Sequence, residues 1–378
     1  MINKLINTIK NNSFLYEFIS KIKGLLFDYK FKILENKWIS NHQNVVSIIN
    51  YSTTSVKSKL NVIWCGINEN QDNSGLIQGL MNNFNTLIYY RSKNNYGLKN
   101  NTSIDENFIH ENGKNLFNYV KLVSKKQKID FLIGQFMGIN INSYWLENIR
   151  KLGIKTISLS WDDKLVFLWN KNYKISCHSI SSSLDYVLGS SLYPLNVYNK
   201  TKPIFFPLAS SPEIFSGNPR SEKTIDVLFI GNQYGTRRDI IKYLKSNNIN
   251  VECYGNDWGT RFLSFEESAL KFKQAKIIIG IGYVSHSRKI TTLKLRDFDA
   301  SISGALYITS KNEELELLFP DNQLVFYGNK KELLDKIKFY LKNENKRIEK
   351  ASVLQKYVLD NFTWDILFNK LDAYLKLN

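Results

Sequence analysis

Short apolar runs alternate with helix-length segments along most of this chain of 378 residues. Runs rich in Val, Ile, Leu, Phe and Tyr, separated by helical patterns, are typical of buried parallel strands in βαβ units. They form two groups, one in residues 61–190 and one in residues 226–328: NVIWCG, NTLIYY, FLIGQF, TISLSW and DYVLGS, then DVLFIG, VECYG, IIIGIG, LYITS and LVFYG. The sequence therefore predicts an α/β fold with two parallel sheets.

Proline marks the connection between the two groups of strands. Five of the six prolines lie between residues 194 and 219, and proline interrupts both helices and sheets. We therefore expect an N-terminal domain over 61–205, a linker over 206–225 and a C-terminal domain over 226–378 that ends in helices.

Residues 1–60 precede both groups and form a basic N-terminal extension. They carry nine lysines against three acidic residues, and Ile19, Ile22 and Leu26 recur at helical spacing. A basic amphipathic helix can lie on an anionic membrane surface. The alternative is a pair of ordinary surface helices that pack against the N-terminal domain or a partner subunit.

The net charge narrows the classes of partner. With 51 basic and 34 acidic residues the chain has a formal net charge of +17, which favours an anionic partner through long-range attraction. A phosphorylated substrate, an anionic membrane surface and nucleic acid all fit this charge. Nucleic acid is the least favoured of the three, because no helix-turn-helix, zinc-finger or RNP-like motif is present.

Cysteine and histidine give no sign of a metal site or a resident cofactor. The three cysteines and four histidines have no metal-ligand spacing, so we expect no metal and reduced thiols. No apolar run reaches the length of a membrane span, and no signal peptide precedes the first domain. We therefore predict a cytoplasmic location. The basic extension also allows peripheral attachment to the inner face of the membrane.

The C-terminal group of strands opens with a turn that favours anion binding. Its first run ends at Gly231, a short loop leads to Arg237, and an amphipathic helix follows. The N-terminus of a helix offers backbone N–H groups and the positive end of a dipole to an anion. A second basic loop, with His286, Arg288 and Lys294, follows another strand end. Together these features predict a pocket for a nucleotide diphosphate.

The order of motifs over residues 226–365 resembles the C-terminal half of GT-B glycosyltransferases, in particular the group 1 branch that includes spore maturation protein B-like proteins. The matching motifs are Gly231 to Arg237, Tyr254 to Trp258, Arg296 to Asp299, Gly304 and Thr363-Trp364. The resemblance implies two facing Rossmann-like domains and metal-independent transfer of a sugar from a nucleotide-sugar donor to a glycan or lipid-linked acceptor. The alternative is a non-catalytic nucleotide- or glycan-binding module of the same fold.

The resemblance also implies roles for single residues. Arg296 would stabilise the departing diphosphate, and Asp299 takes the place of the family's ribose-binding Glu. Tyr254 and Trp258 fit either base stacking or a place in the core, and His286 fits either a phosphate contact or a structural role in its loop. The predicted donor-binding set is Gly231, Arg237, Tyr254, Trp258, His286, Arg288, Lys294 and Asp299.

Two further carboxylate patterns bear on the chemistry. Asp297 and Asp299 spell an Asp-x-Asp metal motif, but positions i and i+2 of a helix point about 200° apart and cannot share an ion. Asp162 and Asp163 follow the strand TISLSW, where one of them could act as the general base for the acceptor or cap a helix. The loop with Glu69 and Asp72 is the alternative acceptor loop.

Overall fold

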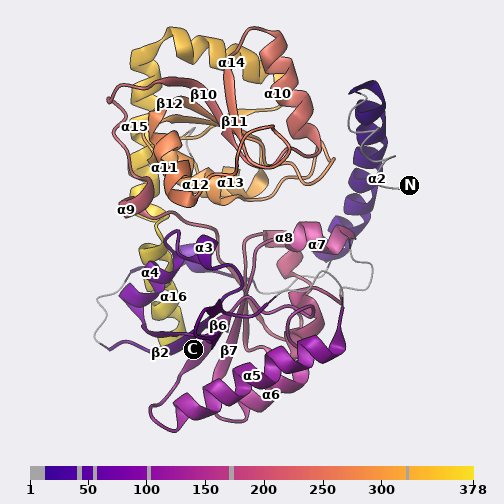
Figure 1. The fold of residues 1–378 in the computed structure, drawn as a ribbon, viewed down its shortest axis with the longest axis vertical. Helices are drawn as coiled ribbons and strands as arrows, with labels where there is room; N and C mark the ends of the chain where they lie inside the picture. Colours follow the sequence, from indigo (N-terminus) through magenta and orange to yellow (C-terminus); the bar gives the residue numbers. More distant parts are fainter. Residues whose placement is uncertain (1–12, 41–44, 54–57, 100–103, 170–173, 321–322) are drawn as a thin grey trace. The chain divides into compact units, whose positions relative to one another are not determined.

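The computed structural model describes residues 13–40, 45–53, 58–99, 104–169, 174–320 and 323–378. The chain divides into two compact units (Figure 1). Unit 1 contains Met1–Asn36 and Phe215–Leu359, and unit 2 contains Lys37–Ile214 and Asp360–Asn378. The predicted N-terminal extension falls partly outside the described residues, at 1–12, 41–44 and 54–57.

These units differ from the domain boundaries expected from the sequence. The C-terminal residues 360–378 belong to unit 2 rather than to the C-terminal domain. The reason is that helix α16 (Trp364–Leu377) packs on α4 (Leu76–Asn83). A Cβ added to Gly79 would lie 2.7 Å from the Cβ of Trp364, so only glycine allows this approach. Of the predicted extension, residues 1–36 belong to unit 1 and residues 37–60 to unit 2.

Unit 2 is built on a parallel sheet. In the described residues its strand order is β1-β9-β8-β7-β6-β2-β3, and every pairing is parallel. The five apolar runs of this half all contain strands. The strands are β1 (Val46–Ser47), β2 (Asn61–Cys65), β3 (Asn85–Ile88), β6 (Phe131–Gly134), β7 (Lys155–Ser160), β8 (Tyr186–Gly189) and β9 (Lys202–Phe205), with β4 (Tyr90–Ser92) and β5 (Asn95–Tyr96) as a separate antiparallel pair.

Side-chain caps begin several of the helices that connect these strands. Asp105 accepts a hydrogen bond from the Phe108 N–H at the start of α5, and Asn142 accepts one from the Trp145 N–H at the start of α6, which satisfies N–H groups that have no partner within the helix. The helices are α3 (Glu69–Asp72), α4, α5 (Glu106–Ser124), α6 (Ser143–Arg150), α7 (Asp163–Trp169), α8 (Leu192–Leu195), α9 (Pro212–Phe215) and α16, with the 3₁₀ helices η1 (Ile48–Asn50) and η2 (Cys177–Ser183).

Unit 1 contains a second parallel sheet, with the order β11-β10-β12-β13-β14 in the described residues. All five apolar runs predicted for this half form strands. They are β10 (Ile225–Ile230), β11 (Val251–Tyr254), β12 (Ala275–Gly280), β13 (Leu306–Ser310) and β14 (Val325–Tyr327), connected by α10 (Thr236–Ser246), α11 (Phe265–Gln274), α12 (Leu295–Ile302), α13 (Glu313–Leu318), α14 (Lys330–Lys342) and α15 (Glu344–Asn361).

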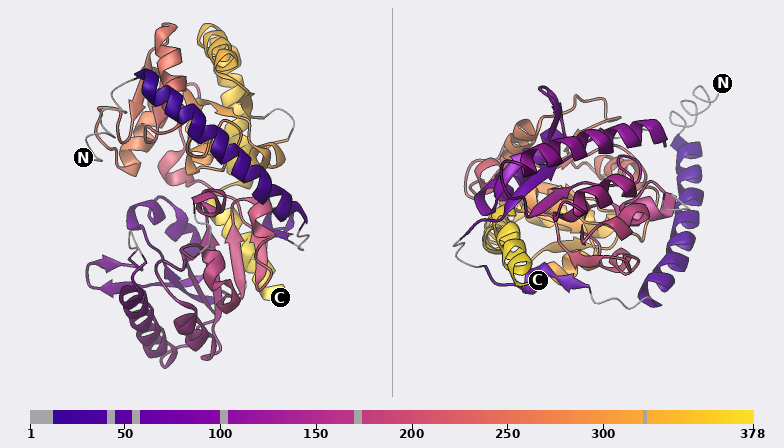
Figure 2. Two further views of the ribbon diagram at one scale, coloured as in Figure 1. Left: turned by 90° about the vertical axis from the view of Figure 1, so that its right-hand side faces the viewer. Right: turned by 90° about the horizontal axis from the view of Figure 1, so that it is seen from below.

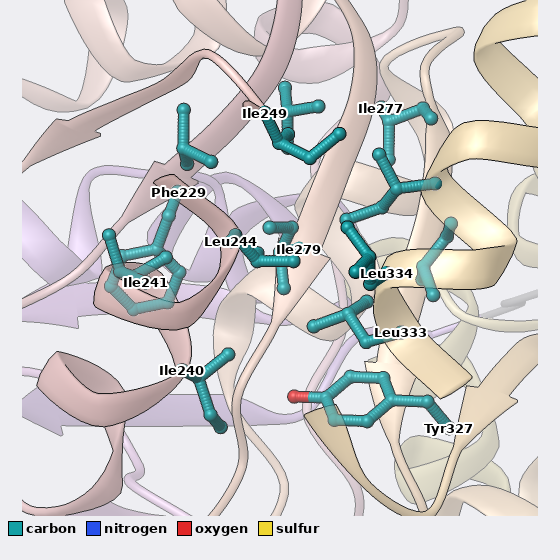
Figure 3. Close-up of a cluster of buried hydrophobic side chains, with 14 of the residues drawn as sticks. Phe229, Ile240, Ile241, Leu244, Ile249, Ile277, Ile279, Tyr327, Leu333 and Leu334 are labelled. Atoms are coloured by element: carbon teal, nitrogen blue, oxygen red, sulfur yellow. The ribbon is translucent and has the colours of Figure 1, made fainter. Parts of the chain in front are cut away.

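The core of unit 1 lies between this sheet and helices α10 and α14. Phe229 and Ile279 from the strands meet Ile241 and Leu244 of α10 and Leu333 of α14 (Figure 3). Burial of one such side chain stabilises a fold by about 1.5–3 kcal/mol, so this cluster holds β10 and β12 firmly. The loops that follow these two strands therefore start from a rigid base.

Both sheets contain a point where the order of the strands reverses. In unit 1 the first strand, β10, lies between β11 and β12, and in unit 2 β2 lies between β3 and β6. Connections leave such a strand pair in opposite directions, which opens a crevice outside the carboxyl ends of the strands, where ligands of open α/β sheets bind. The expectation of two Rossmann-like halves is confirmed.

Gly235 fixes the turn between β10 and α10, and its replacement tests this local structure. Gly235 has a φ of +56°, and a Cβ there would lie 1.6 Å from the carbonyl oxygen of Ser285. Gly259 has a similar φ of +77° and nothing within 4 Å of a Cβ. We expect Gly259→Ala to cost about 1–2 kcal/mol of stability from its backbone angle. Gly235→Ala should cost about 1–3 kcal/mol more from the overlap.

The measurement is the free energy of unfolding of each variant from urea denaturation. Gly259→Ala is the control, since Gly259 also has a positive φ but makes no close contact. Equal losses in the two variants would contradict the proposed contact with Ser285.

Candidate active site

Two arginines meet at the strand-order reversal of unit 1. Arg237 lies in the first turn of α10 and Arg296 in the first turn of α12. Between them runs the backbone of Gly231, the residue after β10. A Cβ added to Gly231 would lie 2.9 Å from Nη2 of Arg296 and 3.3 Å from Nη1 of Arg237. Both guanidinium groups therefore lie against the same short stretch of backbone.

Each guanidinium group is held in place by carbonyl oxygens and aromatic rings. Arg237 is 4% exposed, its Nη1 donates to the carbonyl of Asn232 at 3.0 Å, and its charge lies 4.0 Å from the ring centre of Tyr234. Arg296 Nε donates to the carbonyl of Ile230 at 2.9 Å, and its guanidinium lies 4.7 Å from the ring centre of Phe229. These contacts orient both groups before any ligand is present.

The positive charge of this pair is not balanced by a salt bridge with a described residue, although the charge of Arg296 acts on the neighbouring carboxyl group of Asp297. Among the residues that the structure describes, neither arginine forms an ion pair, and Nε of Arg237 and Nη1 of Arg296 are buried without a hydrogen-bond partner. Burial, and then the nearby charge of Arg296, lower the pKa of Arg237 to about 10. Arg237 still stays charged at neutral pH. Unused donors on two adjacent cations favour an anion with several oxygen atoms.

Helix α12 carries the two aspartates of the apparent metal motif, and they have different surroundings. The backbone N–H of Lys294 donates to Asp297 Oδ2 at 2.7 Å, and the Tyr307 hydroxyl donates to Asp297 Oδ1. Burial raises the pKa of Asp297. Asp299 is 7% exposed on the same helix as Arg296. No group of three or more His, Cys, Asp or Glu residues that could hold a metal ion occurs in the described part of the chain.

The two predicted aromatic residues, Trp258 and Tyr254, make different contacts. Trp258 Nε1 donates to the carbonyl of Gly231 at 2.7 Å, and its ring packs on Phe229, so Trp258 supports the loop between the arginines. The Tyr254 hydroxyl instead donates to Glu252 at 2.9 Å, and Lys271 lies 5.2 Å from its ring centre.

The second basic loop makes contacts that the sequence did not indicate. Oγ of Ser20 lies 2.9 Å from Nδ1 of His286, and burial lowers the pKa of this histidine. Arg288 lies 3.6 Å from a carboxylate oxygen of Asp239, and Lys294 is the residue before α12. The structure thus brings together Gly231, Arg237, Trp258 and Arg296, while His286 faces helix α2 (Ser13–Ser40) and Arg288 faces Asp239.

Tyr234 is a member of this site that sequence reasoning missed. It lies in the loop between Gly231 and α10 and stacks on Arg237. The only feature of the sequence that could have indicated Tyr234 is its position three residues before Arg237.

In unit 2 the strand-order reversal holds a closed network around Asp72. The Tyr96 hydroxyl donates to Asp72 Oδ2 at 2.6 Å, Gln135 Nε2 donates to Oδ1 at 3.3 Å, and Trp64 Nε1 donates to the Tyr96 oxygen. Asp72 is fully buried, and burial raises its pKa to about 6. The network fixes the loop after β2, which is the predicted alternative acceptor loop. Glu69, the other acidic residue of that loop, accepts a hydrogen bond from the Tyr90 hydroxyl.

Asp162 and Asp163 follow β7 and point to different surroundings. Asp162 is exposed, whereas Asp163 is 2% exposed and accepts hydrogen bonds from Ser160 Oγ at 2.6 Å and the Tyr198 hydroxyl at 2.9 Å. Burial raises the pKa of Asp163 to about 7. Of the two carboxylates, only that of Asp162 is accessible to a substrate in unit 2.

The pKa of Asp163 predicts how stability depends on pH. Folded Asp163 keeps its proton up to about pH 7, whereas in the unfolded chain the carboxyl group has its ordinary pKa of 3.8. The contribution of this residue to stability is therefore highest at low pH and falls as the pH rises from 4 to 7. Asp163→Asn removes the ionisable group. The free energy of unfolding of this variant should therefore exceed that of the parent by on the order of 1–4 kcal/mol between pH 5 and pH 8.

Thermal unfolding of the parent, Asp163→Asn and Asp162→Asn over this pH range checks the prediction. Asp162→Asn is the control, because it removes the exposed neighbouring carboxylate and should keep the pH dependence of the parent. Parallel pH profiles for the parent and Asp163→Asn would contradict a buried, protonated Asp163.

Comparison with known proteins bears on the fold and on residues 237–371. Residues 237–371 match the family described as "Glycosyl transferase-like". No curated protein sequence matches the chain. Among solved structures, it is similar to an alpha-glucosyltransferase in complex with UDP and a 13-mer DNA, with 12% identity and a TM-score of 0.58 over 85% of this chain and 100% of the other.

Two further structures show the same fold. HepE of Anabaena, in complex with UDP and glucose, has 8% identity and a TM-score of 0.57 over 84% of this chain and 100% of the other. The BGT of T4 phage, in complex with its UDP-glucose substrate, has 16% identity and a TM-score of 0.52 over 84% of this chain and 99% of the other. The chain thus has the two-domain α/β fold of GT-B glycosyltransferases, and residues 237–371 match a glycosyltransferase family.

Proposed function

We propose that this protein is a glycosyltransferase that takes its sugar from a nucleotide-diphosphate donor, with the diphosphate bound between Arg237 and Arg296. The observation that carries the proposal is this pair of oriented guanidinium groups, which forms no ion pair with a described acidic residue. It lies at the carboxyl ends of β10 and β12, where open α/β sheets bind ligands. Two of the similar solved structures are complexes with UDP, which supports a nucleotide as the ligand.

The proposed chemistry needs a cationic site rather than a nucleophile. The acceptor hydroxyl oxygen bonds to the anomeric carbon while the bond from that carbon to the diphosphate oxygen breaks. The hydroxyl proton passes to a base, and the nucleoside diphosphate leaves with increased negative charge. Arg237 and Arg296 stabilise that charge in place of a divalent cation. We propose Asp162 as the base in unit 2, because it is exposed after β7 and Asp163 is buried.

The acceptor that we propose is a glycan or a lipid-linked glycan, used in the synthesis of cell-surface polysaccharide on the cytoplasmic side of a membrane. The net charge of +17 supports an acceptor that bears phosphate. Similar solved structures include a DNA modifying enzyme, beta-glucosyltransferase, and an alpha-glucosyltransferase with bound DNA, so DNA should be tested as an acceptor as well. A non-catalytic nucleotide-binding module is the alternative, and turnover separates the two.

The central test replaces each arginine. Arg296→Gln and Arg237→Gln should each lower sugar transfer on the order of 100-fold or more, since each removes a charge that stabilises the leaving group. Nucleoside diphosphate released from a panel of nucleotide sugars measures turnover, and calorimetry measures binding of UDP. We expect chelation of divalent metal to leave turnover unchanged.

Arg220→Gln is the matched control, because Arg220 is exposed in unit 1 and its loss changes the net charge equally. Circular dichroism shows whether each variant is folded. Folded Arg296→Gln protein with normal turnover would remove the diphosphate assignment. Nucleotide binding without turnover of any donor would favour the non-catalytic module.

Asp299 is proposed to hold the ribose hydroxyls of the donor. It lies on α12 one turn after Arg296 and is buried. Asp299→Ala should weaken binding of UDP by about 1–3 kcal/mol, the cost of a lost hydrogen bond to a buried group, and Asp299→Glu should restore it. Inorganic pyrophosphate lacks the ribose, so its affinity should be the same in all three proteins. An equal loss of UDP and pyrophosphate affinity in Asp299→Ala would instead indicate a disturbed arginine pair.

A further inference from the structure

Helix α2 is attached to unit 1 by one narrow face. Oγ of Ser20 lies 2.9 Å from Nδ1 of His286, a Cβ on Gly24 would lie 2.5 Å from the carbonyl oxygen of His286, and Asp28 accepts a hydrogen bond from Ser287. Residues 20, 24 and 28 are four apart and so share one face of the helix. This inner face holds the loop that follows β12.

The opposite face of α2 is apolar and exposed. Six large apolar side chains on it have exposed fractions between 43% and 70%: Phe18, Ile22, Leu25, Leu26, Tyr29 and Ile33. At 100° per residue they occupy a sector about 100° wide, centred roughly opposite Ser20 and Gly24. A surface helix of a globular protein normally has a single apolar stripe, which faces the core. In α2 the exposed apolar stripe lies instead on the face opposite Ser20 and Gly24. Figure 2 shows the backbone of α2, in indigo, on the outside of unit 1.

Lysines border this outer stripe on both sides. Lys21 and Lys32 fall on one side of the sector, and Lys23, Lys30 and Lys37 fall on the other. All five are exposed. An apolar stripe between two rows of lysine is the pattern of a helix that lies in the plane of a membrane surface, with its apolar side chains among the acyl chains and its ammonium groups at the lipid phosphates.

We propose that the outer face of α2 docks onto an anionic lipid bilayer. Charge decides between lipid and a second copy of this chain, because two such faces would bring their lysine rows together, whereas lipid phosphates would neutralise them. The helix lies on the surface in this proposal and does not cross it, and no helix in the described residues is long and apolar enough to cross a membrane. The inference does not depend on the proposed enzymatic activity.

The test is sedimentation of the full chain with vesicles of phosphatidylcholine, with and without phosphatidylglycerol. We expect the protein to sediment with the anionic vesicles and to remain in solution with the neutral ones. Lys21→Gln/Lys32→Gln should lower binding roughly 30-fold, from about 1 kcal/mol per lysine. Leu25→Gln/Tyr29→Gln should lower it at least about 10-fold, through loss of buried apolar area.

Matched controls make equal changes at exposed positions elsewhere in unit 1. Phe262→Gln/Leu270→Gln removes two side chains that are 70% and 57% exposed, and Lys331→Gln/Lys338→Gln removes two exposed lysines. Both should bind vesicles like the parent, and so should Arg296→Gln. All variants should keep the parent's circular dichroism spectrum, because every replaced side chain of α2 is exposed.

Several results would overturn the proposal. They are failure of the parent to bind anionic vesicles, binding by the α2 variants equal to that of the parent, and equal loss of binding in the control variants. A dimer in the absence of lipid that Leu25→Gln/Tyr29→Gln converts to a monomer, without vesicle binding by the parent, would assign the face to a second copy of the chain.

Discussion

The order of the parallel strands is the constraint on which the rest of each unit depends. In each sheet one strand pairs with the strand that follows it in the chain on one side and with the next strand of the sheet on the other: β10 lies between β11 and β12 in unit 1, and β2 lies between β3 and β6 in unit 2. The connections must therefore diverge at the carboxyl end of that strand. In unit 1 this divergence is where Gly231 passes between two guanidinium groups, and in unit 2 it is where the network of Asp72 closes.

Buried ionisable side chains differ in kind between the arginine pair of unit 1 and the loops of unit 2. Unit 1 buries cations whose donors are only partly used, as at Arg237, and this is costly unless an anion arrives. Unit 2 buries carboxyl groups that accept hydrogen bonds from hydroxyl groups, as at Asp72 and Asp163, and burial raises the pKa values of both carboxyl groups. The buried acids of unit 2 are suited to holding loops in place, whereas the cations of unit 1 are suited to binding a ligand.

The sequence was sufficient for the sheets and for the position of the arginine pair. Strands are readable because their apolar runs are local, and Arg237 is readable because a short loop joins β10 to α10. A longer loop separates Arg296 from β12, and the place of Arg296 followed from the family motif. Contacts between distant segments were not readable. The packing of Trp364 on Gly79 moved the last helix to unit 2, and the contact of Ser20 with His286 gave the basic loop a neighbour that no motif indicates. Likewise, only the folded chain distinguishes buried Asp163 from exposed Asp162.

The Arg237–Arg296 pair has a consequence for the later steps of a catalytic cycle. A diphosphate leaving group and the released product are the same ion, and arginine remains charged at neutral pH. An interaction that favours bond breakage therefore also retains the product after the sugar has gone. Because Arg237 is almost completely buried, water is poorly placed to compete for its donors. Under the proposed chemistry, departure of the nucleoside diphosphate becomes the slow step, and the rate in the cell then varies with how quickly other enzymes remove that nucleotide.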